Sequence, residues 1–240
     1  MEIHANPFNT YTDQEAVGIG IQVYSSQGGA SNLLHIGILY YHQNDDDSWC
    51  PKFCHLYGIR GPNLINQHVE QEMPQFWVKT SISRLQSIAV GAYCRAVCDP
   101  KNNTNIPYGF SLRDGLLGVE GELRGKWLGE PGDGLTCATF VLCIFRGLNI
   151  DILKINSWDD KPEEDKRVDD IWRDSIASAL PKQVQERFIA GKISSRYRPE
   201  EVAVGANSPD RPLDYSIARE LGDQMLEKLS QIIRCANKWC

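Results

Sequence analysis

Residues 132–147 read GDGLTCATFVLCIFRG, and the rest of the chain is organised around this stretch. The glycines before Cys137 interrupt regular structure, and the apolar run after it has the length of a buried helix ending at Gly147. Either Asp133 or Thr136 can cap the start of that helix. Cys137 then lies in the first turn, where unpaired N–H groups and the helix dipole lower a thiol pKa. The stretch predicts a nucleophilic cysteine; the alternative is a small buried apolar residue.

The composition is typical of a globular protein with a full apolar core. Apolar residues make up 42% of the 240 residues and charged residues 23%. The formal net charge of −6 and the lack of a long basic run argue against a nucleic-acid binder. Residues 1–17 lack the features of a signal peptide, and no apolar run is long enough to span a bilayer. We therefore expect a cytoplasmic protein with no nucleic-acid partner and no membrane span.

Eight cysteines are many for a protein of a reducing compartment, where they stay thiols. Two pairs share the spacing C-x3-C, namely Cys50 with Cys54 and Cys94 with Cys98. Together the pairs offer four ligands to a structural zinc ion, but their spacing differs from that of zinc ribbons, and the second pair falls inside an expected helix. We expect no metal and no cofactor.

The hydrophobic pattern predicts an α+β domain, in which several strands precede most of the helices. The expected strands are residues 16–24, 33–41, 53–59 and 75–78, with a further extended piece at 198–204. The expected helices are a segment that begins after Ser81 or Ser83 and stops before Pro100, and residues 136–147, 168–190 and 214–237. The glycine-rich residues 115–134 are expected to form a mobile loop that passes close to Cys137.

A catalytic cysteine needs a base, and every histidine of the chain lies before residue 70. His35 is the best candidate because it lies inside a strand. If the strands at 33–41 and 53–59 form a hairpin, His35 faces His55 on the same side of the sheet, where a second imidazole can orient the first. His42 is seven residues from His35 and points to the other face. The alternative for each histidine is a hydrogen-bonded core residue.

These residues, taken in order, resemble a known family. LLHIGILYY around His35, IPYGFSL around Tyr108 and GLTCATFVLCIFRGLNI around Cys137 resemble the circularly permuted papain-like enzymes of the NlpC-type superfamily, which include lecithin retinol acyltransferase-like proteins. The resemblance covers roughly residues 15–206. It implies that Cys137 is the nucleophile, His35 the base and His55 the third catalytic residue, while Tyr108 lines the substrate site.

The resemblance implies a small antiparallel sheet packed on the helix that carries Cys137. We expect a permuted papain-like catalytic domain at residues 1–206 and a C-terminal helical extension at 207–240, a candidate contact for a protein partner. The expected function is a thiol-dependent hydrolase, a peptidase, amidase or isopeptidase, acting on a peptide, amide or acyl-ester substrate through an acyl-enzyme. The alternatives are an acyltransferase or thioesterase of the same fold, and a non-catalytic binding module.

Overall fold

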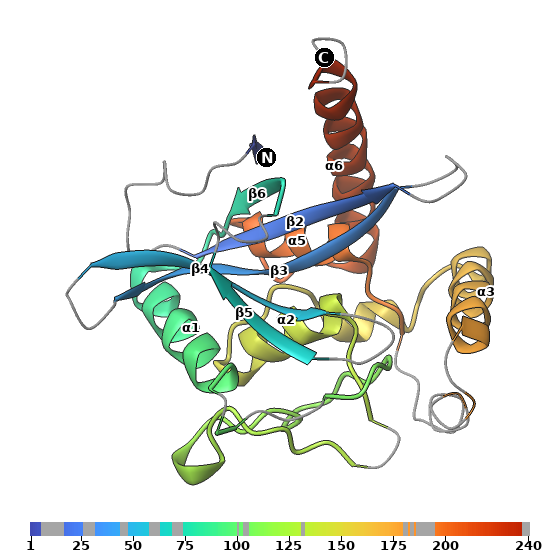
Figure 1. Ribbon diagram of the computed structural model, residues 1–240. Helices are drawn as coiled ribbons and strands as arrows, with labels where there is room; N and C mark the ends of the chain where they lie inside the picture. The colour runs from blue at the N-terminus through green and yellow to red at the C-terminus, as the bar shows by residue number, and fades with distance from the viewer. Residues whose placement is uncertain are drawn as a thin grey trace.

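An antiparallel sheet lies at the centre of the molecule (Figure 1). The computed structural model describes residues 1–5, 17–25, 32–43, 48–57, 63–68, 74–99, 101–102, 106–130, 133–179, 182, 185 and 195–236. Within these residues six strands lie side by side in the order β1-β6-β2-β3-β4-β5. The strands are β1 (His4–Ala5), β2 (Gly18–Ser25), β3 (Asn32–Gln43), β4 (Trp49–Tyr57), β5 (Asn63–His68) and β6 (Phe76–Lys79).

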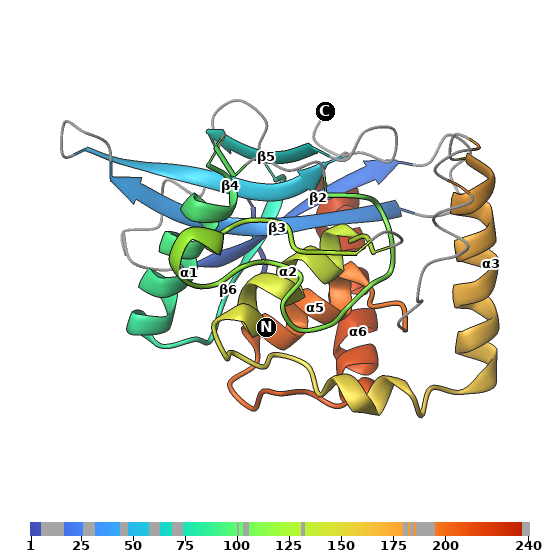
Figure 2. The same cartoon turned by 90° about the horizontal axis from the view of Figure 1, so that it is seen from below.

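Helices cover one face of the sheet. The α-helices are α1 (Arg84–Val97), α2 (Cys137–Gly147), α3 (Glu163–Ala179), α5 (Pro199–Asn207) and α6 (Tyr215–Ala236), with 3-10 turns η2 (Gly121–Leu123) and η3 (Ile155–Trp158). Figure 2 shows α1, α2 and α5 beneath the sheet, whereas α3 stands at its side. The protein is therefore a mixed α+β fold, in which a small antiparallel sheet packs on the helix that carries Cys137.

Most of the expected elements are present, and several are longer than expected. β3 and β4 contain the expected strands, except that residues 58–59 lie outside the described residues. Ser83 caps α1 through a capping box, since its hydroxyl accepts from the Gln86 N–H and its own N–H donates to the Gln86 side chain. The helix expected at 168–190 begins earlier, at Glu163, and its part beyond 179 falls almost entirely outside the described residues.

Two expectations about secondary structure were wrong. Residues 198–204 are not extended: they enter helix α5, in which Pro199 occupies the first turn and Glu200 and Glu201 follow it. A proline at this position and acidic residues beside it are typical of a helix start, and they outweigh the short β-branched stretch that follows. Strand β5 was not expected, because its sequence, NLINQH, is polar and lacks a clear apolar alternation.

The β3–β4 register differs by two residues from the expected one. The ladder pairs Ile38 with Cys54. Gly37, and not His35, therefore lies directly against His55. A Cβ atom at Gly37 would lie 2.5 Å from the His55 Cβ, so only glycine fits there. A shift of two residues keeps each side chain on its face, whereas a shift of one would reverse it. His35 and His55 therefore still share a face, as diagonal neighbours.

The two faces of β3 pack into different parts of the core. Ile36, Ile38 and Tyr40 belong to the large cluster that joins the sheet to the helices. Leu39 and Tyr41 belong to a small cluster on the other face. Most of α2 is buried within the large cluster, which explains its almost entirely apolar sequence.

The C-terminal helix is part of the same core as the sheet. In α6, the side chains of Ala218, Met225 and Leu229 are buried in the large cluster, and the helix packs along α5. The segment at 207–240 is thus a helical extension in sequence but shares its core with residues 1–206. None of the described helices has the length and apolar character needed to cross a membrane.

The glycine-rich segment at 115–134 packs mainly at the far end of α2. Val119 lies beside Gly147, the last residue of that helix, whereas Cys137 is its first. Only the end of the segment lies near Cys137. Gly134 packs against Tyr108 and Gly109, and the N–H of the next residue, Leu135, donates to the Pro107 carbonyl at 2.8 Å. The loop expected to pass close to Cys137 therefore does so only at its end, because the described residues before it fold back toward α1 and the last turn of α2.

Candidate active site

Cys137 is the first residue of α2, and threonines fix the helix start. The Thr136 hydroxyl accepts from the Thr139 N–H at 3.1 Å, and the Thr139 hydroxyl accepts from the Thr136 N–H at 2.8 Å. This reciprocal pair is a capping box. Asp133, the other candidate cap, instead pairs with Arg113 at 2.6 Å. The cap leaves the first N–H groups of α2 directed at the space beside Cys137.

The sulfur of Cys137 meets the sheet at β3. It accepts hydrogen bonds from the backbone N–H groups of Ile36 and Ala138. The Ile36 N–H belongs to the peptide unit that links His35 to Ile36, so the thiol lies against the backbone of the candidate base. Cys137 as a residue is partly exposed, but its sulfur is shielded enough that burial raises the pKa of the thiol.

The two candidate histidines form a hydrogen-bonded pair. His35 Nε2 lies 2.9 Å from His55 Nδ1, and the rings are perpendicular within about 20°. His55 is fully buried and stacks on Phe53 with ring centroids 4.4 Å apart. The structure thus brings together the two imidazoles that the sequence placed on one face, although the register differs.

The position of the pair relative to Cys137 follows from how β3 and β4 run. Beyond Ile38 the ladder between them stops, although both strands continue, and Figure 1 shows them diverging there. Strand alternation places the side chains of His35 and His55 on one face of the sheet. Ile36 lies on the other face, against which α2 packs. The Cys137 sulfur therefore contacts the His35–Ile36 peptide unit from the helix side, whereas the His35 imidazole projects from the other face of β3.

The pKa of the Cys137 thiol is raised and that of its candidate base, His35, is lowered. Burial raises the pKa of Cys137, although the N–H groups of Ile36 and Ala138 partly offset that effect. Burial, and then the charge of His55, lower the pKa of His35 to about 3. Both shifts favour a neutral thiol and a neutral imidazole. The expectation that the helix start lowers the Cys137 pKa was wrong, because burial of the thiol outweighs the hydrogen bonds that it accepts from backbone N–H groups.

Tyr108 and Glu200 complete the surroundings of the thiol. Tyr108 is largely buried, which raises the pKa of its hydroxyl, and the charge of Cys137 raises that pKa further. Glu200, in the first turn of α5, is 7% exposed, and its burial raises its pKa. Its charge in turn raises the pKa of Cys137, so the carboxyl lies within electrostatic range of the sulfur. Tyr108 was predicted to line the substrate site, and it too lies within electrostatic range of Cys137.

Glu200 and Arg196 were not among the site residues predicted from the sequence. The charge of Arg196 lowers the pKa values of both Tyr108 and Glu200. The signal that could have found Glu200 is the string RPEE at 198–201, which is typical of a helix start and would have placed two carboxyls in one turn. No local signal marks Arg196, because its proximity to Tyr108 depends on the tertiary fold.

The zinc alternative can be compared with the arrangement of the thiols. Cys54 Sγ lies 3.0 Å from Cys98 Sγ, and Cys94 also hydrogen-bonds to Cys54. Burial and these bonds raise the Cys54 pKa, so the thiol stays protonated. Among the described residues, no group of three or more histidines, cysteines or carboxylates is arranged to hold a metal ion. The cluster instead joins β4 to α1.

Comparison of the chain with protein-family models, with curated proteins and with solved structures gives no match in any of the three. The site must therefore be interpreted from its own geometry.

The low pKa of His35 predicts how stability depends on pH. The folded protein leaves His35 neutral down to about pH 3, whereas the unfolded chain binds a proton near pH 6.5. The unfolded state therefore binds more protons between these values, and the free energy of unfolding falls as the pH is lowered through that window. We expect urea unfolding of wild type between pH 7 and pH 4.5 to show about 1 to 3 kcal/mol of loss that His35→Gln lacks.

The matched control for this measurement is His4→Gln, which removes a histidine outside the site. It should keep the pH dependence of wild type. Equal slopes for wild type and His35→Gln would show that His35 titrates alike in the folded and unfolded chains.

Proposed function

We propose that the protein is a thiol-dependent hydrolase that cleaves an amide or ester through an acyl-enzyme, with Cys137 as nucleophile, His35 as base and His55 as the residue that orients it. The observation that carries the proposal is the position of the Cys137 sulfur. It lies at the start of a capped helix and accepts a hydrogen bond from the Ile36 N–H, in the peptide unit that follows His35. The His35 imidazole is hydrogen-bonded to that of His55. A nucleophile, a base and an orienting group are the parts that covalent catalysis needs.

The protons can be followed through the proposed reaction. Because His35 Nε2 lies 2.9 Å from His55 Nδ1, the atom that we propose as the base is His35 Nδ1. Nδ1 takes the thiol proton as the sulfur bonds to the substrate carbonyl carbon, and the Cys137 N–H stabilises the oxyanion. The C–N or C–O bond then breaks, and the imidazolium returns the proton to the leaving group. Water, deprotonated by His35, attacks the thioester and releases the acid and the free thiol. If another acceptor replaces water, the same steps give acyl transfer.

In the unliganded site the thiol and the imidazole are both neutral. An imidazole with a pKa of about 3 is a weak base, so the proposal requires substrate binding to raise the pKa of His35 before the thiol proton moves. Catalytic hydrogen bonds of unliganded sites are commonly long and shorten in the substrate complex. We propose that substrate, held beside Tyr108, brings the sulfur and His35 Nδ1 into direct contact where β3 and β4 separate.

The permuted papain-like fold is the architecture that we propose for this site. Its support is the order along the chain: a strand with His35, a strand with His55, the helix α1, the segment at Tyr108, and the helix that begins at Cys137. In this proposal α6 extends the fold at its C-terminal end and offers its exposed side to a protein partner.

Thiol labelling tests the proposed function. Wild-type protein is treated with a limiting amount of iodoacetamide, and separately with an acyl electrophile, and the modified peptides are identified by mass spectrometry. We expect the acyl electrophile, which resembles a substrate, to modify Cys137 first, whereas iodoacetamide modifies the exposed Cys235 first because burial raises the pKa of the Cys137 thiol. Cys143 is the buried, slow reference. Burial raises the pKa of Cys143 to about 12, so it should stay unmodified.

The His35→Ala variant is the control for this labelling. It should reduce the labelling of Cys137 by the acyl electrophile to the level of Cys235 or below. A binding module gives a different result: Cys235 is modified while Cys137 is inert in both proteins. That outcome would remove Cys137 from the role of nucleophile.

A further inference from the structure

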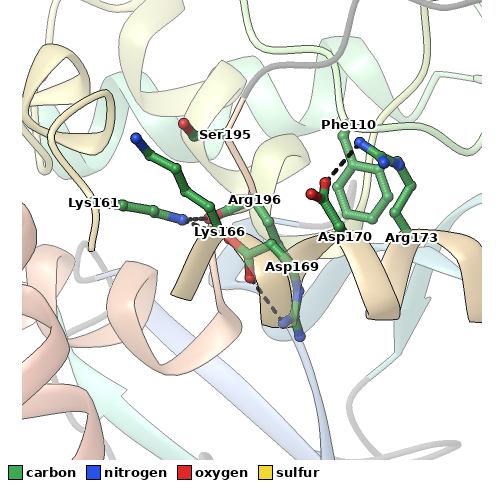
Figure 3. Close-up of a pocket in the computed structure, with 8 residues that line it drawn as sticks. All are labelled: Phe110, Lys161, Lys166, Asp169, Asp170, Arg173, Ser195 and Arg196. Atoms are coloured by element: carbon green, nitrogen blue, oxygen red, sulfur yellow. Dashed lines mark hydrogen bonds and ion pairs between the residues drawn. The ribbon is translucent and has the colours of Figure 1, made fainter. Parts of the chain in front are cut away.

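A cavity of about 270 Å³ opens between α3 and the chain segments at Phe110 and Arg196. Figure 3 shows side chains from α3 on one side of it, with the Phe110 ring close to Asp170 and Arg173. The lining residues are Phe110, Lys161, Lys166, Asp169, Asp170, Arg173, Ser195 and Arg196. The mechanism proposed above uses none of them.

The cavity adjoins the candidate active site through two aromatic rings. Phe110, which lines it, lies edge-on to Tyr108 with ring centroids 6.3 Å apart. Tyr108 lies within electrostatic range of both Cys137 and Arg196. The path from the sulfur to the basic side chains of the cavity therefore runs past Tyr108 and Phe110, so a molecule that joins them must be long enough to pass both rings.

Positive charge exceeds negative charge in the cavity lining. Its four basic residues face two carboxylates, and the deeper carboxylate, Asp169, is shared: Lys161 Nζ lies 2.9 Å from one oxygen and Arg196 3.3 Å from the other. Lys161 also donates to the Arg196 carbonyl, at 2.5 Å. Two cations bound to one carboxylate leave a net positive charge in a poorly hydrated place, where an anion is stabilised.

The basic residues at the rim can exchange partners. Lys166 pairs with Glu163 at 2.9 Å, and Arg173 pairs with Asp170 at 2.9 Å and with Asp174 at 3.6 Å; all three carboxylates are mostly exposed. Exposed ion pairs of this kind contribute little to stability. An incoming anion can therefore replace Glu163 or Asp170 at small cost, and the planar guanidinium of Arg173 suits a carboxylate, which it can bind with two N–H groups.

We propose that this cavity binds a carboxylate of the substrate, so that the preferred substrate carries an acidic group joined to the carbonyl that Cys137 attacks by a carbon chain that passes Tyr108 and Phe110. The proposal rests on the proposed function and names its substrate class. The apolar face of Phe110 covers the carbon chain between the carbonyl and the acid, while Arg173 and Lys166 bind the acid itself.

Two maleimides that differ only in charge test the proposal on the full chain. One is 6-maleimidohexanoic acid and the other is its methyl ester. The rate at which each modifies Cys137 is measured by peptide mass spectrometry, with Cys235 as the reference for the intrinsic reactivity of each reagent. We expect the acid to be favoured over the ester at Cys137 by about tenfold relative to Cys235, as a charge-assisted hydrogen bond provides. Half-molar salt should reduce that preference.

Arg173→Gln and Lys166→Gln should each reduce the preference for the acid, and Lys154→Gln is the matched control. Lys154 pairs with Asp214 outside the cavity, so its loss changes the net charge equally but should leave the preference unchanged. Lys166 is 43% exposed, so this variant keeps the test open if Arg173→Gln fails to fold.

The outcomes separate the two proposals. If the ester does not modify Cys137, the proposed function fails. If the ester reacts but the acid is not favoured, or if the preference survives both cavity variants, the carboxylate site is wrong while the nucleophile stands.

Discussion

We expect the His35→Ala variant to lose turnover by about 10³-fold or more, because it removes the base that takes the thiol proton. The pKa of Cys137 is raised by burial, so few thiolates form without a base in place. The activity to be compared is hydrolysis of a fluorogenic ester or amide that wild type turns over. Unchanged melting temperature and circular dichroism would show that the loss is chemical.

His42→Ala is the matched control for His35→Ala. His42 lies on the same strand, opposite Cys50, but an odd number of residues from His35, so its side chain faces away from the His35–His55 pair. Its replacement should reduce turnover only slightly. Comparable turnover in wild type and His35→Ala would exclude His35 from the mechanism.

The second large effect is expected at His55. His55→Ala should lower turnover by about 10-fold to 100-fold, less than the loss of the base, because its role is to orient His35. Asparagine should restore more activity than glutamine. The Asn side-chain oxygen can take the place of His55 Nδ1, which lies 2.9 Å from His35 Nε2, whereas the longer Gln side chain extends past it.

A packing role for His55 predicts a different pattern. The ring is fully buried and stacks on Phe53, so its truncation also removes apolar contacts. If packing is its only role, all three variants lose stability while turnover per folded molecule stays at the wild-type value. Measuring the melting temperature and turnover of His55→Ala, His55→Asn and His55→Gln separates the two roles.

The sequence predicted those parts of the fold in which a local pattern and the tertiary environment agree. The run after Cys137 is apolar on all sides because α2 is buried on all sides, and Thr136 and Ser83 cap their helices as their spacing indicates. The strand β5 was missed because its polar sequence lacks apolar alternation, although it pairs with the preceding strand β4. The helix α5 was misassigned because the helix-start signal of Pro199, Glu200 and Glu201 was overlooked.

The site was predictable to the extent that it depends on the parity of residues along a strand. His35 and His55 meet although the register differs by two, because parity survives such a shift and Gly37 leaves space for His55. The pKa of Cys137 was not predictable. It depends on how the sheet covers the helix start, and loss of hydration is a property of the assembled fold.

The burial of α6 in the main core has a consequence for synthesis of the chain. Met225 and Leu229 of α6 belong to the same core cluster as Val17 and Ile19. The first strands of the sheet therefore cannot complete their packing until the last helix has been synthesised. A nascent chain that has not yet reached Leu229 exposes the apolar surface that these side chains cover. Such surface is where partly folded chains aggregate. The protein should therefore depend on ribosome-associated chaperones during translation more than a chain whose core is complete within its first half.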